Sequence, residues 1–435
     1  MENGLIRPQH SLYLAMGFGL SLMVSFALVI SFFPIINPVA LESVEEVVLP
    51  QTQLHPSDAF QEVESIVSPT PAPLTGKLSS IVSEPEPKAA DTPQDSVHLL
   101  FGGDVNEGRW GDNPDWHVPL VDSFVNLLPL MQGMDLVFFN AEGGLCDPVE
   151  AGFDLKPRGS NILWVTPASL IGLQTELGET ALAIDQANNH TMNLGEACMR
   201  HGIKTLSDAG ISVLGAGKDL STARAPYVLE LDGTVIGILA YADTNVIIDA
   251  WVADSDHAGV MPMDAEVFKE DMEKLRPAVD FLIVTFHSGK EFERAVTENQ
   301  VQFALAAVQY GADLVIGHGA HVPQGVLQIE DTPIFFGLGN GMMDQCFPDD
   351  YAFYTNDVRK NVWLEVEIRK TELISVHDHV FYSAKCMVPS IATSAIQAEV
   401  IYAFENILFM EDFPVLSNLA TDDLGSEDAA DNLVD

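Results

Sequence analysis

Basic side chains are scarce in this chain. Its 435 residues carry 20 Lys and Arg against 63 Asp and Glu, so the formal net charge at pH 7 is −43. A field of this sign repels nucleic acid and other polyanions unless cations lie between the two partners. The imbalance therefore argues against a nucleic-acid-binding protein, and it is also typical of a solvated surface that keeps a protein soluble.

Cysteine is equally scarce. The chain has four cysteines, widely spaced and without a CxxC pair, which excludes the ligand pattern of a zinc ribbon. One or two disulfides in an oxidising compartment and four buried thiols are both compatible with the sequence. The four residues are Cys146, Cys198, Cys346 and Cys386.

Several common catalytic and nucleotide-binding motifs are missing. Gly102-Gly103-Asp104 is not the GxGxxG fingerprint of a dinucleotide site. The segment GAGK at 215–218 lacks Walker spacing and the following Ser or Thr, so it indicates a tight turn. No GxSxG elbow is present. These absences argue against a Rossmann oxidoreductase, a P-loop enzyme and a serine hydrolase of the elbow type.

Charged side chains are absent between Arg7 and Glu42. Within this stretch, residues 11–36 are almost wholly apolar, and as a helix they are long enough to span a hydrocarbon core of about 30 Å. A cleaved signal peptide is the alternative, but Pro38-Val39-Ala40 matches an A-x-A cleavage site poorly. The sequence therefore predicts a transmembrane anchor over 11–36.

The charges on either side of this segment predict its orientation. Arg7 and the amino terminus are the positive groups on one side, and Glu42, Glu45 and Glu46 follow on the other. The positive-inside rule then places residues 1–10 in the cytoplasm and the rest of the chain outside. We expect a single-pass protein of the cell membrane, attached through its N-terminal helix.

Proline recurs among Ser, Thr, Glu and Gln over residues 37–95. Stretches such as PTPAPL and SEPEPK favour extended polyproline-like conformations and cannot bury enough apolar surface to fold alone. We interpret this segment as a spacer between the membrane and a folded domain over 96–392. A helical extension over 393–420 and an acidic, disordered tail over 421–435 are expected to follow.

The domain alternates short apolar runs with helical patterns. In two of the helical patterns apolar residues recur at helical spacing before a glycine, at Gly195–Ala209 and Glu298–Tyr310. Beyond Pro333 the pattern becomes β, ending in a hairpin over 362–382. Strands that alternate with helices predict an α/β domain, with mixed β-sheets in a β-sandwich flanked by helices. The apolar runs are Val97–Gly103, Asp135–Asn140, Ala181–Asp185, Thr234–Tyr241, Asp280–Phe286 and Ala312–Gly317.

Polar side chains follow the ends of these predicted strands. In open α/β sheets, ligands bind beyond the carboxyl ends of the strands. A mixed set of His, Asn and carboxylate groups is the ligand type expected for Zn²⁺, Mn²⁺ or Fe²⁺. The sequence therefore predicts a metal site or polar active site at this rim. The side chains concerned are Asp104, Asn106, Asn140, Glu142, Asn188, Asn189, His190, His287, Lys290, Glu291, His318 and His321.

These motifs, in this order and spacing, resemble the CapA family of poly-γ-glutamate capsule synthesis proteins, whose domain is similar to calcineurin-like metallophosphoesterases. The resemblance covers about residues 97–392 and leaves out the linker and the tail. The blocks that carry it are GDVNEGR at 103–109, NAEGGL at 140–145, ANNHTMNLG at 187–195, TLSDAGISVLGAG at 205–217, HSGKE at 287–291, GADLVIGHGAHVPQG at 311–325 and GLGN at 337–340.

The resemblance implies roles for particular residues. Asp104 and His190 would be the catalytic pair, and one or two divalent ions (Mn, Zn, Fe or Mg) would polarise a phosphoryl or carbonyl oxygen. Arg109 and Lys290 would hold a carboxylate or phosphate of the substrate. The implied metal ligands are Asp104, Glu142, Asn189, His287, His318 and His321. The implied substrate-binding residues are Arg109, Asn140, Lys290, Glu291 and Asn340.

Three positions depart from the pattern of the resembled families. Asn106 stands where the phosphoesterases have a His, Gly319 where CapA-like proteins often have a His, and Asn193 where an Asp usually follows the NNH motif. Each departure removes a ligand or a residue that orients one. A one-metal site and a metal-free binding site therefore remain alternatives to a two-metal site.

The resemblance and the residues together support three hypotheses about function. The first is a role in the synthesis, export or anchoring of a poly-γ-glutamate-type capsule polymer, with polymer-synthesis or export proteins in the membrane as partners. The second is a metal-dependent hydrolase of phosphoester or amide bonds, with an anionic polymer or a small molecule as substrate. The third is a scaffold that binds polymer without turnover.

Overall fold

The structure is a computed structural model that describes residues 96–109, 118–149, 151–152, 162–345, 356–385 and 387–409. The predicted membrane anchor, the linker and the acidic tail lie outside these ranges. Within them, no helix combines the length and the apolar character needed to cross a bilayer.

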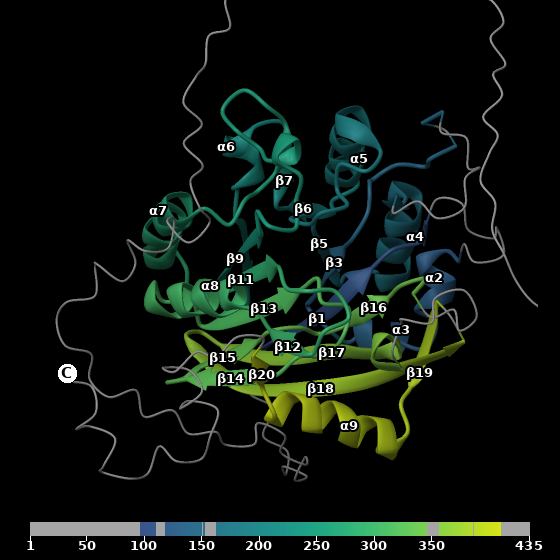
Figure 1. Ribbon diagram of the computed structural model, residues 1–435, viewed down its shortest axis with the longest axis vertical. Coiled ribbons are helices and arrows are strands. Elements are labelled where there is room, and N and C mark those ends of the chain that lie inside the picture. The colour runs from purple at the N-terminus through teal and green to yellow at the C-terminus, as the bar shows by residue number, and fades with distance from the viewer. Residues whose placement is uncertain are drawn as a thin grey trace, which may run out of the picture. The chain divides into compact units, whose positions relative to one another are not determined.

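Two mixed β-sheets form the centre of the described region (Figure 1). The larger sheet has the strand order β19-β18-β17-β1-β3-β5-β6, with β16 also paired to β1. Its strands are β1 (Val97–Val105), β3 (Leu136–Ala141), β5 (Ala181–Asp185), β6 (Ser212–Leu214), β16 (Asn340–Met342), β17 (Lys360–Arg369), β18 (Glu372–Lys385) and β19 (Val388–Ile391).

The smaller sheet has the order β14-β15-β13-β11-β9-β8. Its strands are β8 (Tyr227–Leu231), β9 (Thr234–Ala242), β11 (Phe281–His287), β13 (Leu314–His318), β14 (Val326–Ile329) and β15 (Thr332–Phe335). Short two-stranded pairs join loops outside both sheets. They are β2 (Gly108–Arg109) with β4 (Leu163–Trp164), β7 (Ala216–Gly217) with β10 (Gly259–Val260), and β12 (Ala295–Val296) with β20 (Leu408–Phe409).

The central strands of each sheet run parallel. In the larger sheet β1, β3, β5 and β6 are parallel. Strand β17 is antiparallel to β1 and forms with β18 the antiparallel hairpin that the sequence pattern beyond Pro333 predicts. In the smaller sheet β9, β11, β13 and β15 are parallel, with β8 and β14 antiparallel at the edges. The carboxyl ends of the parallel strands within each sheet therefore lie along one edge.

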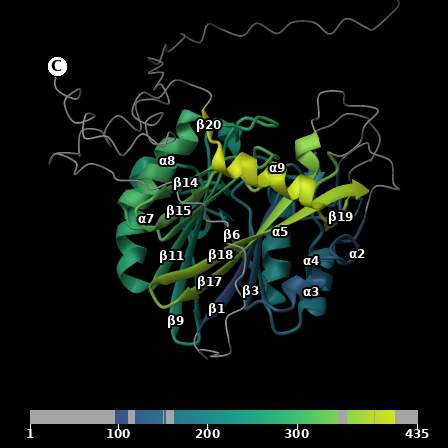
Figure 2. The ribbon, with the colours of Figure 1, turned by 90° about the horizontal axis from the view of Figure 1, so that it is seen from below.

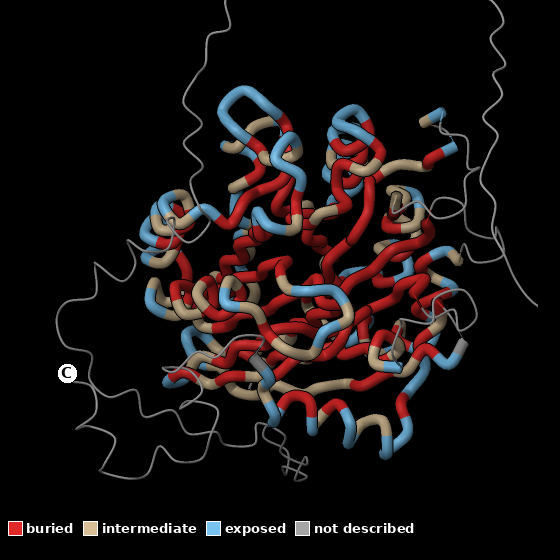
Figure 3. The backbone as a smooth tube through the Cα atoms, in the orientation of Figure 1, coloured by how far each residue is buried: buried red, intermediate tan, exposed pale blue. Residues whose placement is uncertain are grey.

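The two sheets pack face to face and share a core. Leu99 and Phe101 of β1 belong to the same buried cluster as Ile238 of β9 and Ile283 of β11, whereas Leu100 belongs to a cluster on the opposite face of the larger sheet. This alternation is the period of a strand buried on both faces. The prediction of an α/β domain built on a β-sandwich is confirmed. In Figure 3 these strands appear as a continuous buried centre.

Helices cover the outer faces of both sheets (Figure 2). Apolar side chains of α2, α3, α4 and α5 pack against the larger sheet, and those of α6, α7 and α8 against the smaller sheet. Helix α9 packs through Val400 and Phe404 on the shared core. The helices are α2 (Leu120–Ser123), α3 (Leu128–Met131), α4 (Pro167–Leu177), α5 (Gly195–Asp208), α6 (Leu220–Ala223), α7 (Ala265–Leu275), α8 (Glu298–Gln309) and α9 (Ser394–Glu405), with 3₁₀ turns η2 (Asp249–Trp251), η3 (Arg276–Ala278) and η4 (Asn356–Arg359).

Helices α5 and α8 confirm the two helices that the apolar spacing predicts. Helix α8 connects β11 to β13 and begins with a capping box. The side chain of Thr297 accepts a hydrogen bond from the backbone N–H of Gln300, whose side chain in turn accepts one from the Thr297 backbone. These two bonds satisfy donors that the helix start would otherwise leave free.

Replacing Thr297 with Ala is expected to lower the free energy of unfolding by about 1 kcal/mol, because one of these donors loses its acceptor. Urea denaturation of the full chain measures the change. Thr175→Ala is the matched control, since among the described residues its hydroxyl bonds only to the Ile171 carbonyl within α4. Equal losses in both variants would contradict a capping role for Thr297.

One disulfide lies within the described residues. Cys146, shortly after β3, is bonded to Cys198 in α5, with a Cα–Cα distance of 5.4 Å. The sequence left the cysteine state open, and the pairing settles it for these two residues. Cys346 and Cys386 lie outside the described ranges. The bond ties the loop that follows Glu142 to the helix that follows His190.

Candidate metal centre

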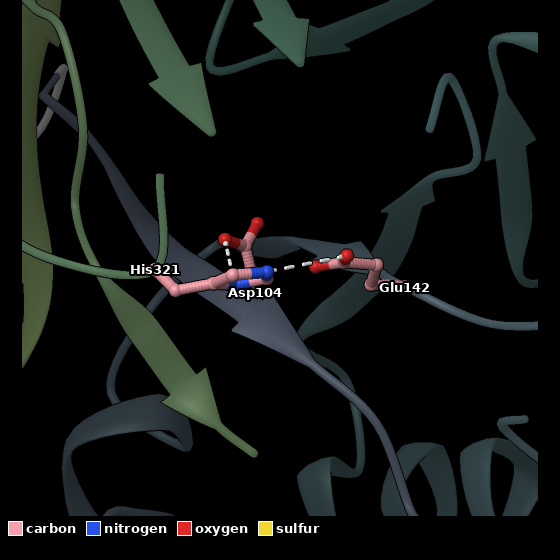
Figure 4. Close-up of side chains that lie close together, drawn as sticks. All are labelled: Asp104, Glu142 and His321. Carbon is pink, nitrogen blue, oxygen red and sulfur yellow. Dashed lines mark ion pairs between the residues drawn. The ribbon is translucent and has the colours of Figure 1, made fainter. Parts of the chain in front are cut away.

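Two carboxylate side chains and one imidazole lie close together where strands of the two sheets end. Asp104 lies near the end of β1, Glu142 directly follows β3, and His321 lies in the loop after β13. Each offers one ligand atom, and the three atoms lie within 4.8 Å of one another. Figure 4 shows the three side chains, with dashed lines for the ion pairs of His321 with Asp104 and Glu142. All three side chains are buried. The cluster thus takes two members from the larger sheet and one from the smaller.

The Asp104 carboxylate is held by several donors. Its Oδ1 accepts a hydrogen bond from Asn140 Nδ2 at 2.7 Å, and its Oδ2 accepts one from the Gly319 backbone N–H at 3.1 Å. His321 Nδ1 lies 3.1 Å from the same Oδ2. Burial alone would raise the pKa of Asp104, but the hydrogen bond and charge of His321 hold it below its ordinary value. Asp104 is therefore ionised.

Glu142 lacks such donors. Both carboxylate oxygens are buried, and neither has a hydrogen-bond partner among the described residues. His321 Nε2 lies 3.6 Å and His190 Nε2 3.8 Å from Glu142 Oε1. Burial raises the pKa of Glu142 well above its ordinary value. A buried carboxyl group without donors is costly, and a bound cation would satisfy it.

His321 has a defined orientation and a strained backbone. Its φ is +60°, a conformation that non-glycine residues rarely adopt and that is often found at functional sites. Nδ1 lies 3.1 Å from Asn340 Oδ1 and 3.1 Å from Asp104 Oδ2, so it carries a proton and leaves Nε2 directed at Glu142. The ring also stacks on Phe292.

The charge state of His321 is sensitive to its two acidic neighbours. Burial would lower the pKa of His321, but the Glu142 charge and the hydrogen bond to Asp104 raise it to about 10. His321 would have to release the proton on Nε2 to hold a metal ion there, because metal ligation requires the imidazole to be unprotonated at the ligating nitrogen.

Further buried polar atoms near this cluster have no hydrogen-bond partner among the described residues. They include both ring nitrogens of His318, Asn189 Oδ1 and Asn106 Oδ1. His318 Nδ1 lies 3.7 Å from Asp104 Oδ1, and burial lowers the pKa of His318, which leaves its ring neutral. Carboxylate oxygens, imidazole nitrogens and amide oxygens are the ligand types of Zn²⁺, Mn²⁺ and Fe²⁺. The donor set therefore fits a divalent metal.

His190 is fixed in one tautomer. Asn193 Oδ1 accepts a hydrogen bond from the Leu163 backbone N–H at 2.7 Å, which identifies this atom as the amide oxygen. His190 Nδ1 lies 2.8 Å from the same oxygen and must therefore be the donor. Burial lowers the pKa of His190 to about 4. The ring is neutral with a free lone pair on Nε2, so Asn193 still orients it although it replaces the expected Asp.

Arg109 makes a two-point contact with an acidic residue that the sequence reasoning missed. Its Nε lies 2.8 Å from Asp344 Oδ2, and its second nitrogen lies 3.3 Å from Asp344 Oδ1. Asn106 Nδ2 donates to the same Oδ1 at 3.1 Å. The one available signal was that Asp344 follows β16, as polar residues follow the other strands. Arg109 therefore contacts a carboxylate of the protein itself, whereas the sequence predicted that it would hold a carboxylate or phosphate of the substrate.

The other predicted substrate-binding residues divide into two groups. Asn140 and Asn340 are buried, and their amides bond to neighbouring protein groups, so the geometry assigns them to orienting Asp104, His287 and His321. Lys290 and Glu291 are exposed. Lys290 pairs with Glu293 at 3.5 Å, whereas the Glu291 charge raises the pKa of Glu142 and His321, which places it at the edge of the cluster.

Gly319 explains one departure from the resembled pattern. Its φ is +101°, which side chains rarely tolerate, and a Cβ there would lie 3.0 Å from His287 Nε2 and 3.0 Å from the Ser288 carbonyl oxygen. A histidine at this position would be strained in this backbone. The missing side chain is therefore a requirement of the local geometry.

Comparison with known proteins adds to this geometry. Residues 98–345 match the family model described as bacterial capsule synthesis protein PGA_cap. The chain is 26% identical to the PGA biosynthesis protein CapA of Bacillus subtilis over 60% of its own length and 66% of that protein. It is 25% identical to the capsule biosynthesis protein CapA of Bacillus anthracis over 51% of its length and 54% of that protein.

The matches to these relatives thus cover between about half and just under two thirds of the relatives' lengths. Among solved structures, the calcineurin-like phosphoesterase YfkN from Bacillus subtilis is similar with a TM-score of 0.40 and 14% identity, over 71% of this chain and 99% of that one.

Proposed function

The chain belongs to the PGA_cap family of bacterial capsule synthesis proteins, and from this we propose that it acts in the synthesis, export or anchoring of a poly-γ-glutamate-type polymer through a metal-dependent hydrolytic site. The observation that carries the second half of the proposal is the buried cluster of Asp104, Glu142 and His321. Its unsatisfied Glu142 carboxylate has no structural role that the described residues explain.

Asp104, Glu142 and His321 Nε2 would hold the ion, with His318 and Asn189 supplying further donors. A divalent ion of Mn, Zn, Fe or Mg supplies Lewis acidity that polarises a phosphoryl or carbonyl oxygen of the substrate. The protein groups around it are buried and fixed by hydrogen bonds, so they orient the reacting groups without rearrangement.

His190 contributes proton transfer. Its neutral ring presents the Nε2 lone pair on the Glu142 side of the cluster, and Asn193 holds the proton on Nδ1. In this state His190 takes a proton from an attacking water first and returns it to the leaving group afterwards. Amide and alkyl phosphoester substrates need such a transfer to their basic leaving groups.

The negative charge of the chain constrains how it meets an anionic polymer. A formal charge of −43 disfavours direct contact over a broad surface, so cations or membrane partner proteins would mediate it. Partner proteins of polymer synthesis or export in the membrane satisfy this requirement, and the predicted N-terminal helix would hold the chain beside them.

The Cys146–Cys198 disulfide supports a location outside the cytoplasm, because structural disulfides persist in oxidising compartments. We expect a protease digest of the chain isolated from cells, alkylated and kept unreduced, to yield a linked peptide pair containing Cys146 and Cys198. Mass spectrometry before and after reduction detects the pair. Recovery of both cysteines as alkylated thiols would contradict this location.

The proposed function is tested on the purified full-length chain by metal analysis and by assays on bis(p-nitrophenyl) phosphate and on poly-γ-glutamate. We expect a stoichiometric divalent metal and turnover of one substrate that is lost in His190→Ala. His201→Ala is the matched control, because His201 is exposed on α5. Polymer binding without metal and without turnover would overturn the hydrolytic site and favour a scaffold.

A further inference from the structure

Hydrogen bonds behind the cluster determine which nitrogen of His287 carries its proton. The relevant chain of amides begins at Asn188, whose Oδ1 accepts from the His190 backbone N–H at 3.0 Å. The Asn188 Nδ2 group therefore donates, and its acceptors are the Ala141 carbonyl at 3.1 Å and Asn140 Oδ1 at 2.9 Å. These two backbone groups thus fix the orientation of the Asn188 amide, and with it the direction of the hydrogen bonds that follow.

The orientation of the Asn140 amide in turn determines how Asn140 bonds to His287. Because its Oδ1 is the acceptor, its Nδ2 supplies two protons, one to Asp104 Oδ1 at 2.7 Å and one to His287 Nδ1 at 3.1 Å. Nδ1 of His287 is consequently an acceptor without a proton of its own. A ring with an accepting nitrogen is neutral, because a charged imidazolium donates from both nitrogens. The single ring proton of His287 is then on Nε2.

This tautomer is unsuited to metal ligation. Nδ1 uses its lone pair for Asn140, and Nε2 uses its electron pair for the N–H bond, so neither nitrogen has a free lone pair. His318 and His321 differ, because each has a ring nitrogen without a hydrogen bond that is directed at the acidic residues of the cluster. His287 is thereby distinguished from the other two histidines.

Gly319 lies directly beside His287 Nε2. The absent Cβ of Gly319 would lie 3.0 Å from this nitrogen, and the Gly319 backbone N–H donates to Asp104 Oδ2 at 3.1 Å. Nε2 therefore lies beside the Gly319 backbone, whose N–H bonds to Asp104 of the acidic cluster. Among the described residues, His287 forms its side-chain hydrogen bond through Nδ1 and none through Nε2.

We propose that His287 is a substrate-binding donor, presenting Nε2–H to an oxygen of a phosphoryl or carboxylate group, and that Asn140 is the positioning residue that fixes this tautomer. The inference rests on the proposed function for the identity of the ligand. It changes the role that the family resemblance implies for His287 from metal ligand to hydrogen-bond donor.

The tautomer is tested by long-range ¹H–¹⁵N NMR of the full-length, metal-free chain labelled with ¹⁵N-histidine. His287→Gln identifies the His287 signals by their loss. We expect the pattern of a neutral ring protonated on Nε2, and in Asn140→Asp a shift of the proton to Nδ1, because the new carboxylate accepts and cannot donate. Asn126→Asp, which adds the same charge at an exposed position, is expected to leave the pattern unchanged. A wild-type ring protonated on Nδ1 would overturn the proposal even if Asn140→Asp failed to fold.

The ligand role is tested by calorimetry with Mn²⁺, inorganic phosphate and L-glutamate. We expect His287→Ala to keep metal affinity within about threefold of wild type, whereas His321→Ala loses about 100-fold or more. Affinity of the metal-loaded chain for one of the two anions should fall about tenfold in His287→Ala, and that anion distinguishes a phosphoryl from a carboxylate ligand.

A loss of Mn²⁺ affinity in His287→Ala as large as in His321→Ala would overturn the donor role, as would unchanged affinity for an anion that the wild type binds. Failure of the wild type itself to bind any divalent metal has a different meaning. That outcome would overturn the proposed hydrolytic site, while the NMR result still decides the His287 tautomer.

Discussion

Glu142→Gln is expected to lower the affinity for a divalent ion by about 100-fold or more, and to make the metal-free chain more stable. Both effects have one cause. The buried Glu142 carboxylate has no hydrogen-bond donor among the described residues, and burial raises its pKa well above the ordinary value. Its charged form is therefore unfavourable without a cation, and the neutral amide removes about 1–3 kcal/mol of that cost at pH 8.

Calorimetric titration with Mn²⁺ and thermal unfolding in chelator measure the two effects on one preparation. Glu176→Gln is the matched control, since it removes the same charge from an exposed position on α4 and should change neither quantity. A Glu142→Gln chain that is less stable than wild type without metal would show that Glu142 has a structural partner.

Asp185→Asn is expected to flatten the pH dependence of stability between about pH 4 and pH 7. Asp185 ends β5 in the larger sheet and is buried. Its Oδ2 accepts a hydrogen bond from Thr285 Oγ1 of the smaller sheet at 2.7 Å, and Oδ1 accepts one from the Ala187 N–H at 2.6 Å. Burial nevertheless dominates and raises the pKa of Asp185 from 3.8 to about 7.

Whether stability rises or falls with pH depends on whether the folded or the unfolded state loses the Asp185 proton at the lower pH. Below pH 4 both the folded and the unfolded chain carry the protonated acid, so the ionisation of Asp185 does not lower the free energy of unfolding. As the pH rises towards 7, the unfolded state releases the proton first, so stability falls, and above pH 7 no further change occurs. A shift from 3.8 to about 7 corresponds to roughly 4 kcal/mol at most, at about 1.4 kcal/mol per pKa unit.

Asn can keep both contacts, with its oxygen accepting from Ala187 and its amide donating to Thr285. The variant should therefore match wild type near pH 4.5 and exceed it at pH 8. Urea denaturation of the metal-free chain at both pH values measures this difference, with exposed Asp256→Asn as control. A stability difference that is the same at both pH values would show that Asp185 ionises normally in the fold.

The arrangement of strands could be predicted from the sequence because it depends on short-range patterns. Apolar runs such as Ala181–Asp185 became strands with nearly the predicted bounds, and the apolar spacing before Gly210 and Gly311 predicted α5 and α8. The rule that polar residues gather at the carboxyl ends of parallel strands brought Asp104 and Glu142 together with His321.

The chemistry of individual side chains could not be predicted in the same way, because it depends on contacts between distant segments. Asp344 pairs with Arg109 across 235 residues of chain, and Asn140 reaches His287 across 147. Which nitrogen of His190 or His287 is protonated follows from single amide orientations that no sequence pattern encodes. The pairing of Cys146 with Cys198 is of the same kind, since four cysteines allow several connectivities.

Because the acidic cluster lies where the two sheets meet, it would link the stability of the fold to the supply of metal. Asp104 and Glu142 belong to one sheet and His321 to the loop beyond a strand of the other, so a bound ion would act as a cross-link between the two halves of the sandwich. By mass action, free metal at about 100 times its dissociation constant would add about 2.7 kcal/mol to the stability of the folded chain. The lifetime of the folded protein would then depend on the concentration of that ion around it, so that scarcity of the metal would reduce both the metal loading of each molecule and the number of folded molecules.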